Sequence, residues 1–240
     1  MKQYIKIIFL IVAILVLSIV MLQKYKLRQL VWANEKFIVL LTMTIDPQNT
    51  LNAKRTNISD RIADYRKSLS RWAELPYKVI VVESSGYGNP FADILTNAKH
   101  IIYISEKTPH IPARGKGYGE SHIIKYAMKN LITDNDIYIM KITGRYAPKK
   151  DLSEIVSMLR NSHPKIVVRH GRSEWFIGKR DFFIAVADNC IEVCGDPTQG
   201  MVSFEANLLA LSQRQQALEY TQRIPVIATV NGRNEAEVEI

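Results

Sequence analysis

An unbroken apolar segment near the N-terminus constrains this chain more than any other feature. The segment runs from Ile7 to Leu22, and Ser18 is its only polar member. At 1.5 Å per residue it covers about 24 Å as a helix, and the stems of Lys6 and Lys24 extend it towards the ~30 Å hydrocarbon core of a bilayer. The pattern predicts a single helix that crosses a membrane.

The flanks of this segment favour a permanent anchor over a cleaved signal peptide. A cleavage site needs small residues just after the apolar stretch, whereas this chain reads MLQKYKLRQ. Basic residues stand on both sides, with Lys2 and Lys6 before the segment and Lys24, Lys26 and Arg28 after it. The positive-inside rule therefore leaves the orientation open. We expect residues 1–28 to form a signal-anchor helix of a single-pass membrane protein.

Charge and composition narrow the classes of ligand. The net charge of the 240 residues is +9, and the five basic residues around the anchor account for part of it. The +4 that remains (9 − 5) is modest for a domain that binds a polyanion, so nucleic acid is not an expected partner and a small phosphorylated ligand fits better. No linker-like tract interrupts the chain, so residues 31–240 are expected to form one domain.

Short apolar segments rich in β-branched residues alternate with amphipathic segments through this domain. This alternation predicts an α/β fold, with a mostly parallel central sheet covered by helices on both faces. Strands are expected at Lys36–Ile45, Tyr77–Glu83, His100–Ser105, Asp136–Ile142, Lys165–Arg169, Asp181–Ala187 and Pro225–Val230. Helices are expected at Arg61–Leu75, from a glycine-rich loop at Arg114–Glu120 through Ile132, at Asp151–Arg160 and at Phe204–Thr221.

Polar side chains gather where three of these strands end. Thr42 and Thr44 follow the first strand, Glu83 opens the turn after the second, and the stretch from Lys141 to Tyr146 follows the fourth. In open α/β sheets, ligands bind beyond the carboxyl ends of the strands. Each position has plain turn chemistry as an alternative, but the convergence of Lys, Arg and Glu favours a ligand site.

The glycine-rich stretch adds a second candidate element. Gly115, Gly117 and Gly119 alternate before a helix, with Arg114 and Lys116 among them. Glycines permit close approach of the backbone, and N–H groups at a helix N-terminus favour an anion. The stretch is neither a P-loop nor a dinucleotide fingerprint. Phosphate binding and a merely flexible loop both remain open.

Four sequence blocks in order resemble small glycosyltransferases of the GT-A fold from bacteria and large viruses. The blocks are RIADYRKSLSRW, VIVVESSGYG, GKGYGESHIIKYAMKN and DIYIMKITGRY, and the resemblance spans about residues 36–204. It implies that the first strand and the Glu83 region hold the nucleotide, and that the chain after the fourth strand faces the diphosphate. The residues expected to bind the donor are Thr42, Glu83, Lys116, Gly117, Lys141, Thr143 and Arg145.

The chain departs from that family at the metal site. Most GT-A enzymes have an Asp-x-Asp after the fourth strand, whereas this chain has Lys141 and Arg145 there. The Asp134–Asp136 stretch has the right letters but precedes the strand, where a helix-to-strand turn explains it. Arg and Lys can both neutralise phosphate charge, so they are expected to replace the cation. No metal ligand and no required cofactor are predicted, and a role for Mn²⁺ or Mg²⁺ stays open.

Transfer with inversion needs a carboxylate that deprotonates the acceptor hydroxyl. Glu205 and Asp196 are the candidates after the donor-binding segments, with Glu120 further upstream. Glu205 could instead complement a helix dipole. Cys190 and Cys194 are expected to be two free core thiols, since no zinc-ligand spacing accompanies them.

These features predict a membrane-anchored glycosyltransferase that moves a sugar from a nucleotide-diphosphate donor to a glycan, lipid-linked or protein acceptor. Two alternatives remain. One is a non-catalytic subunit of glycan assembly, which the missing Asp-x-Asp keeps open. The other is a different nucleotide- or phosphate-handling α/β enzyme, which would need an acidic cluster after a strand.

Overall fold

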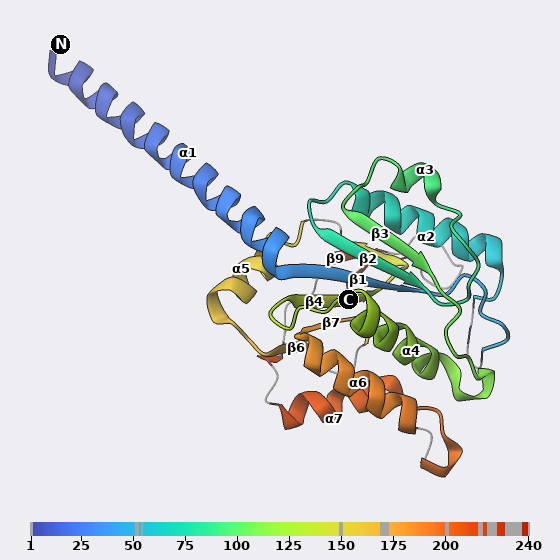
Figure 1. Cartoon of the computed structure of the whole chain (residues 1–240). Helices are drawn as coiled ribbons and strands as arrows, with labels where there is room; N and C mark the ends of the chain where they lie inside the picture. Colours follow the sequence, from blue (N-terminus) through green and yellow to red (C-terminus); the bar gives the residue numbers. More distant parts are fainter. Residues whose placement is uncertain are drawn as a thin grey trace.

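A seven-stranded mixed sheet organises the globular part of the chain in the computed structural model (Figure 1). The order of its strands is β3-β2-β1-β4-β7-β6-β8. The structure describes residues 2–50, 53, 55–148, 151–168, 173–199, 202–215, 218–219, 225–228 and 237–239. The strands of this sheet are β1 (Phe37–Met43), β2 (Lys78–Glu83), β3 (Ile101–Ser105), β4 (Tyr138–Thr143), β6 (Ile166–Val168), β7 (Trp175–Gly178) and β8 (Leu218–Glu219).

The sheet is parallel through its first four strands. β3, β2, β1 and β4 run in one direction, β7 runs antiparallel to β4, and β6 runs antiparallel to β7. A second, antiparallel sheet joins β5 (Tyr146–Pro148), β9 (Pro225–Ala228) and β10 (Glu237–Glu239). The predicted strands at residues 36–45, 77–83, 100–105 and 136–142 are confirmed as the four parallel strands.

Helices cover both faces of the sheet, as the sequence pattern predicts. On one face, Tyr65, Leu69 and Trp72 of α2 pack against alternate residues of β1, among them Val39 and Leu41. The opposite face of β1 meets α4 and α6, with α7 beyond them. The helices are α2 (Ile58–Ala73), α3 (Ala92–Leu95), α4 (Gly115–Asn130), α5 (Ser153–Ser162), α6 (Arg180–Val193) and α7 (Phe204–Arg214), with 3-10 turns η1 (Pro112–Arg114) and η2 (Pro197–Gln199).

The N-terminal helix α1 is longer than the predicted anchor. It spans Lys2–Lys36 and passes directly into β1 without a loop. Its apolar residues from Phe9 to Leu22 are exposed, and the segment Phe9–Lys36 is long and apolar enough to cross a membrane. Its last turns pack on the domain, where Ala33 is buried and the rings of Trp32 and Tyr138 lie 6.1 Å apart.

The strand predicted at Asp181–Ala187 is wrong, because these residues lie within α6. The buried residues of α6 include Phe182, Phe183, Val186 and Cys190, a spacing of three to four that suits a helix and not a strand. The strand of this region lies earlier, at Trp175–Gly178, where all four residues are buried.

The two cysteines correct a second expectation. Cys190 and Cys194 are joined by a disulfide and are not free thiols. Because Cys190 lies in α6 and Cys194 follows its last turn, the two Cα atoms are 4.7 Å apart. A helix places side chains four positions apart on one face, so the two cysteines can form a disulfide. Along an extended strand the same two residues would lie too far apart.

The glycine-rich stretch is helical and not a loop. α4 begins at Gly115 and includes Gly117 and Gly119. A Cβ atom added to Gly117 would lie 2.9 Å from the Cβ of Phe204 in α7, whereas one added to Gly119 would meet nothing within 4 Å. Gly117 therefore allows α4 and α7 to pack closely. The predicted helix at Phe204–Thr221 ends at Arg214, and part of its expected C-terminal end lies outside the described residues.

The two helical glycines give a matched test of this packing. Gly119→Ala should stabilise the protein by about 0.5–1 kcal/mol, because alanine favours a helix over glycine. Gly117→Ala should instead destabilise it, since overpacking costs about 1–3 kcal/mol. The free energy of unfolding in urea measures both. An equal gain for the two substitutions would contradict the close contact between α4 and Phe204.

Candidate active site

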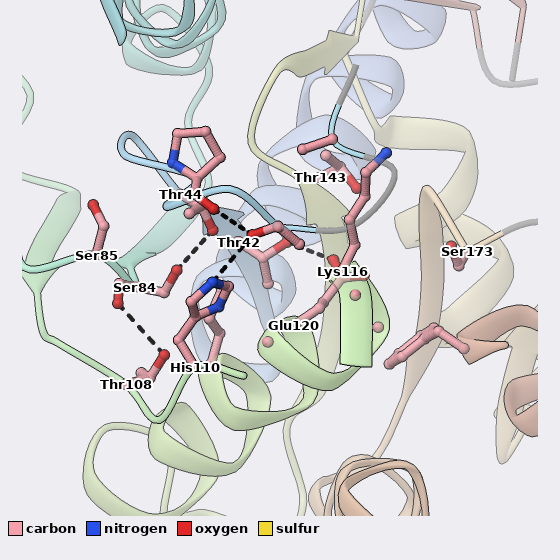
Figure 2. A pocket seen from close by; sticks show the side chains of 18 of the residues that line it. Thr42, Thr44, Ser84, Ser85, Thr108, His110, Lys116, Glu120, Thr143 and Ser173 are labelled. Atoms are coloured by element: carbon pink, nitrogen blue, oxygen red, sulfur yellow. Dashed lines mark hydrogen bonds between the residues drawn. The ribbon is translucent and has the colours of Figure 1, made fainter. Parts of the chain in front are cut away.

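A cleft of about 530 Å³ opens at the carboxyl ends of the parallel strands. Thr42 and Thr44 line it from the end of β1, and Ser84 and Ser85 from the turn after β2 (Figure 2). The N-terminal turns of α4, the chain after β4 and the start of α7 complete its walls. The cleft lies at the edge of the sheet where open α/β folds bind ligands.

The structure separates the predicted site residues into two groups. Those that line the cleft are Thr42, Lys116, Gly117, Thr143, Arg145 and Glu205. Those that do not are Glu83, Lys141 and Asp196, and each of these three has a protein partner that explains its position.

Glu83 is a fully buried carboxylate that organises the wall of the cleft. Its Oε1 accepts hydrogen bonds from the backbone N–H of Ile45 at 3.0 Å and of Ser85 at 2.8 Å. Its Oε2 accepts from the N–H of Tyr87 at 3.1 Å and from the hydroxyl of Ser105 at 2.8 Å. A carboxylate with this many donors fixes the turns after β1, β2 and β3 relative to one another.

Lys141 is also fully buried, and its ammonium group lies beneath the floor of the cleft. Nζ is 2.6 Å from Oε1 of Glu120 and donates a hydrogen bond to the carbonyl oxygen of Ser173 at 2.7 Å. The rings of Phe176 and Phe204 have their centroids 5.7 and 5.8 Å from the same nitrogen. A buried charge is costly unless it is paired. The ion pair with Glu120 and the contacts with the two aromatic rings offset the cost of burying the Lys141 ammonium group.

Glu120 connects this buried lysine to the cleft. It lies in the second turn of α4 and lines the cleft, with 19% of its side chain exposed. Its Oε1 accepts hydrogen bonds from Thr42 at 2.9 Å and from Lys141, as Figure 2 shows for the threonine. Sequence reasoning named Glu120 only as an upstream candidate. Its position one helical turn beyond Lys116, a predicted phosphate-binding residue, is the signal that could have found it.

Glu205 lies in the first turn of α7 and lines the cleft. Ser173 donates a hydrogen bond to its Oε1 at 2.5 Å. Burial raises the pKa of this carboxyl, but hydrogen bonds from Ser173, its own N–H and Ser203, together with the charge of Lys141, hold the pKa below its usual range. Glu205 is therefore an ionised group at neutral pH, which is the state that a general base requires.

Asp196 stabilises the turn in which it lies. Its carboxylate accepts hydrogen bonds from the N–H and the hydroxyl of Thr198, at 2.8 and 2.6 Å, and these lower its pKa. The neighbouring Gly195 lines the cleft, but the aspartate itself does not.

The basic residues of the cleft differ in the hydrogen bonds and ion pairs that they form with other groups of the protein. Arg55 forms an ion pair with Asp64 at 2.6 Å, and Arg61 donates to the carbonyl oxygen of Thr44 at 2.6 Å. Arg114 donates to backbone carbonyls and stacks on a tyrosine ring. Among the described residues, Arg145 has no ion pair with an acidic side chain. Its side chain lines the cleft.

No group of three or more His, Cys, Asp or Glu side chains within the described residues could hold a metal ion. Asp134 and Asp136 lie before β4, at the other end of the sheet from the cleft, and both are exposed. The side chain of Asp134 accepts a hydrogen bond from the N–H of Asp136 at 2.7 Å, as a turn residue does.

Comparisons with known proteins place the fold but not a family. No protein-family model matches the chain, and no curated protein matches it. The glycosyltransferase GlyE of Streptococcus pneumoniae aligns with a TM-score of 0.51 and 8% identity, over 78% of this chain and 45% of that one. Its apo form gives a TM-score of 0.50 and 8% identity, over 77% and 44% of the two chains.

A structure of TarS from S. aureus in complex with UDP is a further match, with a TM-score of 0.48 and 10% identity, over 81% of this chain and 60% of that one. The alignment with GlyE covers 45% of that protein, so this chain spans less than half the length of GlyE. The predicted fold class is confirmed: the chain forms an α/β domain with a mostly parallel, helix-covered sheet of the GT-A-like type.

Proposed function

We propose that this protein is a membrane-anchored glycosyltransferase that uses a nucleotide-diphosphate sugar as its donor. The observation that carries the proposal is the composition of the cleft at the carboxyl ends of the parallel strands. Basic, hydroxyl and carboxylate side chains from β1, α4, the chain after β4 and α7 meet there. GlyE is a glycosyltransferase, and the GT-A-like fold that this chain shares with it supports the same class of reaction.

The donor diphosphate is assigned to the side of the cleft formed by Lys116, Thr143 and Arg145. The planar guanidinium of Arg145 matches two phosphate oxygens at once, and its charge stabilises the diphosphate as it leaves. Lys141 lies beneath this region, and Glu120 already neutralises much of its charge. We therefore assign Lys141 a supporting role, in which it holds Glu120 and the segment at Ser173 in place.

Glu205 is assigned as the general base. It lines the cleft, whereas Asp196 does not and bonds to Thr198 in its own turn. In the proposed step, the acceptor oxygen forms a bond to the anomeric carbon of the donor sugar. The acceptor proton passes to the carboxylate of Glu205, and the bond between the anomeric carbon and the diphosphate breaks, with its electron pair on the diphosphate. Glu120, with one oxygen held by Thr42 and Lys141, is placed to accept a hydrogen bond from a donor hydroxyl.

The anchor part of the proposal is supported by α1. Its residues from Phe9 to Leu22 are apolar and exposed, with no contact to the domain that would bury them. A bilayer is the surrounding that removes this much apolar surface from water, and the basic residues Lys24 and Lys26 then lie at the headgroups.

Removal of the anchor gives the first functional test. A chain that starts at Val31 keeps Trp32 and Ala33, which pack on the domain, and loses the exposed apolar segment. It should be soluble without detergent and should bind nucleotide sugars as the full chain does. Membrane sedimentation and a thermal-shift assay measure this. A truncated chain that still sediments with membranes would contradict the assignment of the anchor.

The donor assignment is tested at Arg145. Its replacement by Ala should weaken the affinity for a nucleotide sugar about ten- to a hundredfold, since a hydrogen bond to a charged group contributes roughly 1.5–3 kcal/mol. Arg66→Ala is the matched control, because Arg66 pairs with Asp93 outside the cleft. Calorimetric titration with a panel of UDP-, GDP- and dTDP-sugars gives both affinities. Unchanged affinity for Arg145→Ala would remove the basis of the diphosphate assignment.

The metal requirement is tested by chelation. If basic residues replace the cation, sugar transfer should survive EDTA, and added Mn²⁺ should change the rate little. Asp134→Ala and Asp136→Ala should leave the rate unchanged, because both residues lie at the far end of the sheet. Activity that EDTA abolishes and Mn²⁺ restores would instead require a metal held by cleft carboxylates such as Glu120 and Glu205.

A further inference from the structure

The anchor and the cleft lie at opposite ends of the sheet. α1 ends at Lys36 and β1 begins at Phe37, whereas the cleft begins at Thr42, near the other end of the same strand. In Figure 1, α1 leaves the domain where β1 starts, and the arrowheads of β1, β2 and β3 point away from it. The chain therefore holds the opening of the cleft on the side of the domain that faces away from the anchor.

The connection between anchor and domain is stiff. No loop separates α1 from β1. Ala33 is buried, the rings of Trp32 and Tyr138 are in contact, and the hydroxyl of Tyr25 lies 3.1 Å from that of Ser157 in α5. These contacts fix the helix against the amino-terminal edge of the sheet, so the domain does not swing freely towards a bilayer.

Element lengths give the height of the cleft. From Leu22, where the apolar segment ends, α1 continues to Lys36 and covers about 21 Å at the helical rise. β1 then adds about 20 Å at the rise of a strand. With the bend between the two, the cleft stands roughly 30–40 Å from the bilayer surface.

The acceptor side of the cleft is polar. Glu205, Ser173 and Ser203 line it together, and carboxylate and hydroxyl groups of this kind form hydrogen bonds with sugar hydroxyl groups. We propose that the acceptor is the water-exposed end of a saccharide, held far above the bilayer, and not a sugar or phosphate at the level of the lipid headgroups. This inference rests on the proposed glycosyltransferase function and on the anchor.

The functional test uses the full chain in vesicles of phosphatidylcholine with phosphatidylglycerol. Soluble nitrophenyl glycosides are first screened as acceptors with UDP- and GDP-sugars. The best acceptor is then attached to a dialkyl lipid, either directly or through a polyethylene glycol spacer. The spacer is about 40 Å long, which matches the height of the cleft above the bilayer. An acceptor that cannot reach the cleft has an effective concentration near zero, so the spaced lipid should exceed the direct one by about a hundredfold or more in kcat/KM. Equal use of the two lipids would overturn the proposal.

The geometry is tested separately from the chemistry. A dye on Lys78→Cys marks the edge near the anchor, and a dye on Glu106→Cys marks the edge near the cleft; both positions are exposed and neither lines the cleft. Energy transfer to a headgroup dye should be stronger for Lys78→Cys. Equal transfer, or stronger transfer from Glu106→Cys, would also overturn the proposal.

The two arms separate the possible failures. If no donor binds and no sugar is transferred to any acceptor, the proposed function fails, whatever the energy transfer shows. If donor is bound and hydrolysed but no glycoside accepts sugar, the glycosyltransferase assignment stands and the saccharide acceptor is wrong. A protein acceptor would then be the alternative to test.

Discussion

A lysine buried in a central strand imposes the main constraint on the site. Lys141 is fully buried in β4, and an unpaired ammonium at that depth would cost several kcal/mol. Glu120 compensates it from α4, at 2.6 Å. The same nitrogen binds the carbonyl oxygen of Ser173, and Phe204 of α7 covers it. One charge therefore ties together the sheet, two helices and the segment before β7.

The consequence is a division of labour among the charged groups of the site. Glu83 and Lys141 are fully buried and satisfied by the protein, so they set the shape of the walls. Arg145 and Glu205 line the cleft, and the proposed function assigns them to the substrates. Ser173 connects the two layers, because its carbonyl oxygen accepts from Lys141 while its hydroxyl donates to Glu205. A change in the buried layer should thus act on the substrate through position, whereas a change in the outer layer should act on it directly.

Several parts of this arrangement follow from the sequence. The apolar segment at residues 7–22 is evident from its length alone, and its side chains are exposed along α1. The strands β1, β2 and β4 are evident because they are almost fully buried, and such burial leaves a short apolar run, whereas β3 is partly exposed and is marked by its β-branched residues. The sequence pattern predicts a strand where α6 forms, because Phe182 and Phe183 are adjacent apolar residues that fit both a helix and a strand over a short window. The disulfide depended on that assignment, since Cys190 and Cys194 approach only when the helix forms.

The sequence alone determined that the chain carries an apolar helix and an α/β domain, and that polar residues follow the ends of its strands. Those are local properties, since they depend on periodicity and on the residues that a turn tolerates. Only the tertiary structure decided which of these polar residues face the cleft. Glu83, Lys141 and Arg145 are equally polar in the sequence, but burial and pairing depend on distant partners such as Ile45, Glu120 and Ser173. The tertiary structure likewise places α1 and the cleft at opposite ends of β1, because α1 continues into β1 without a loop.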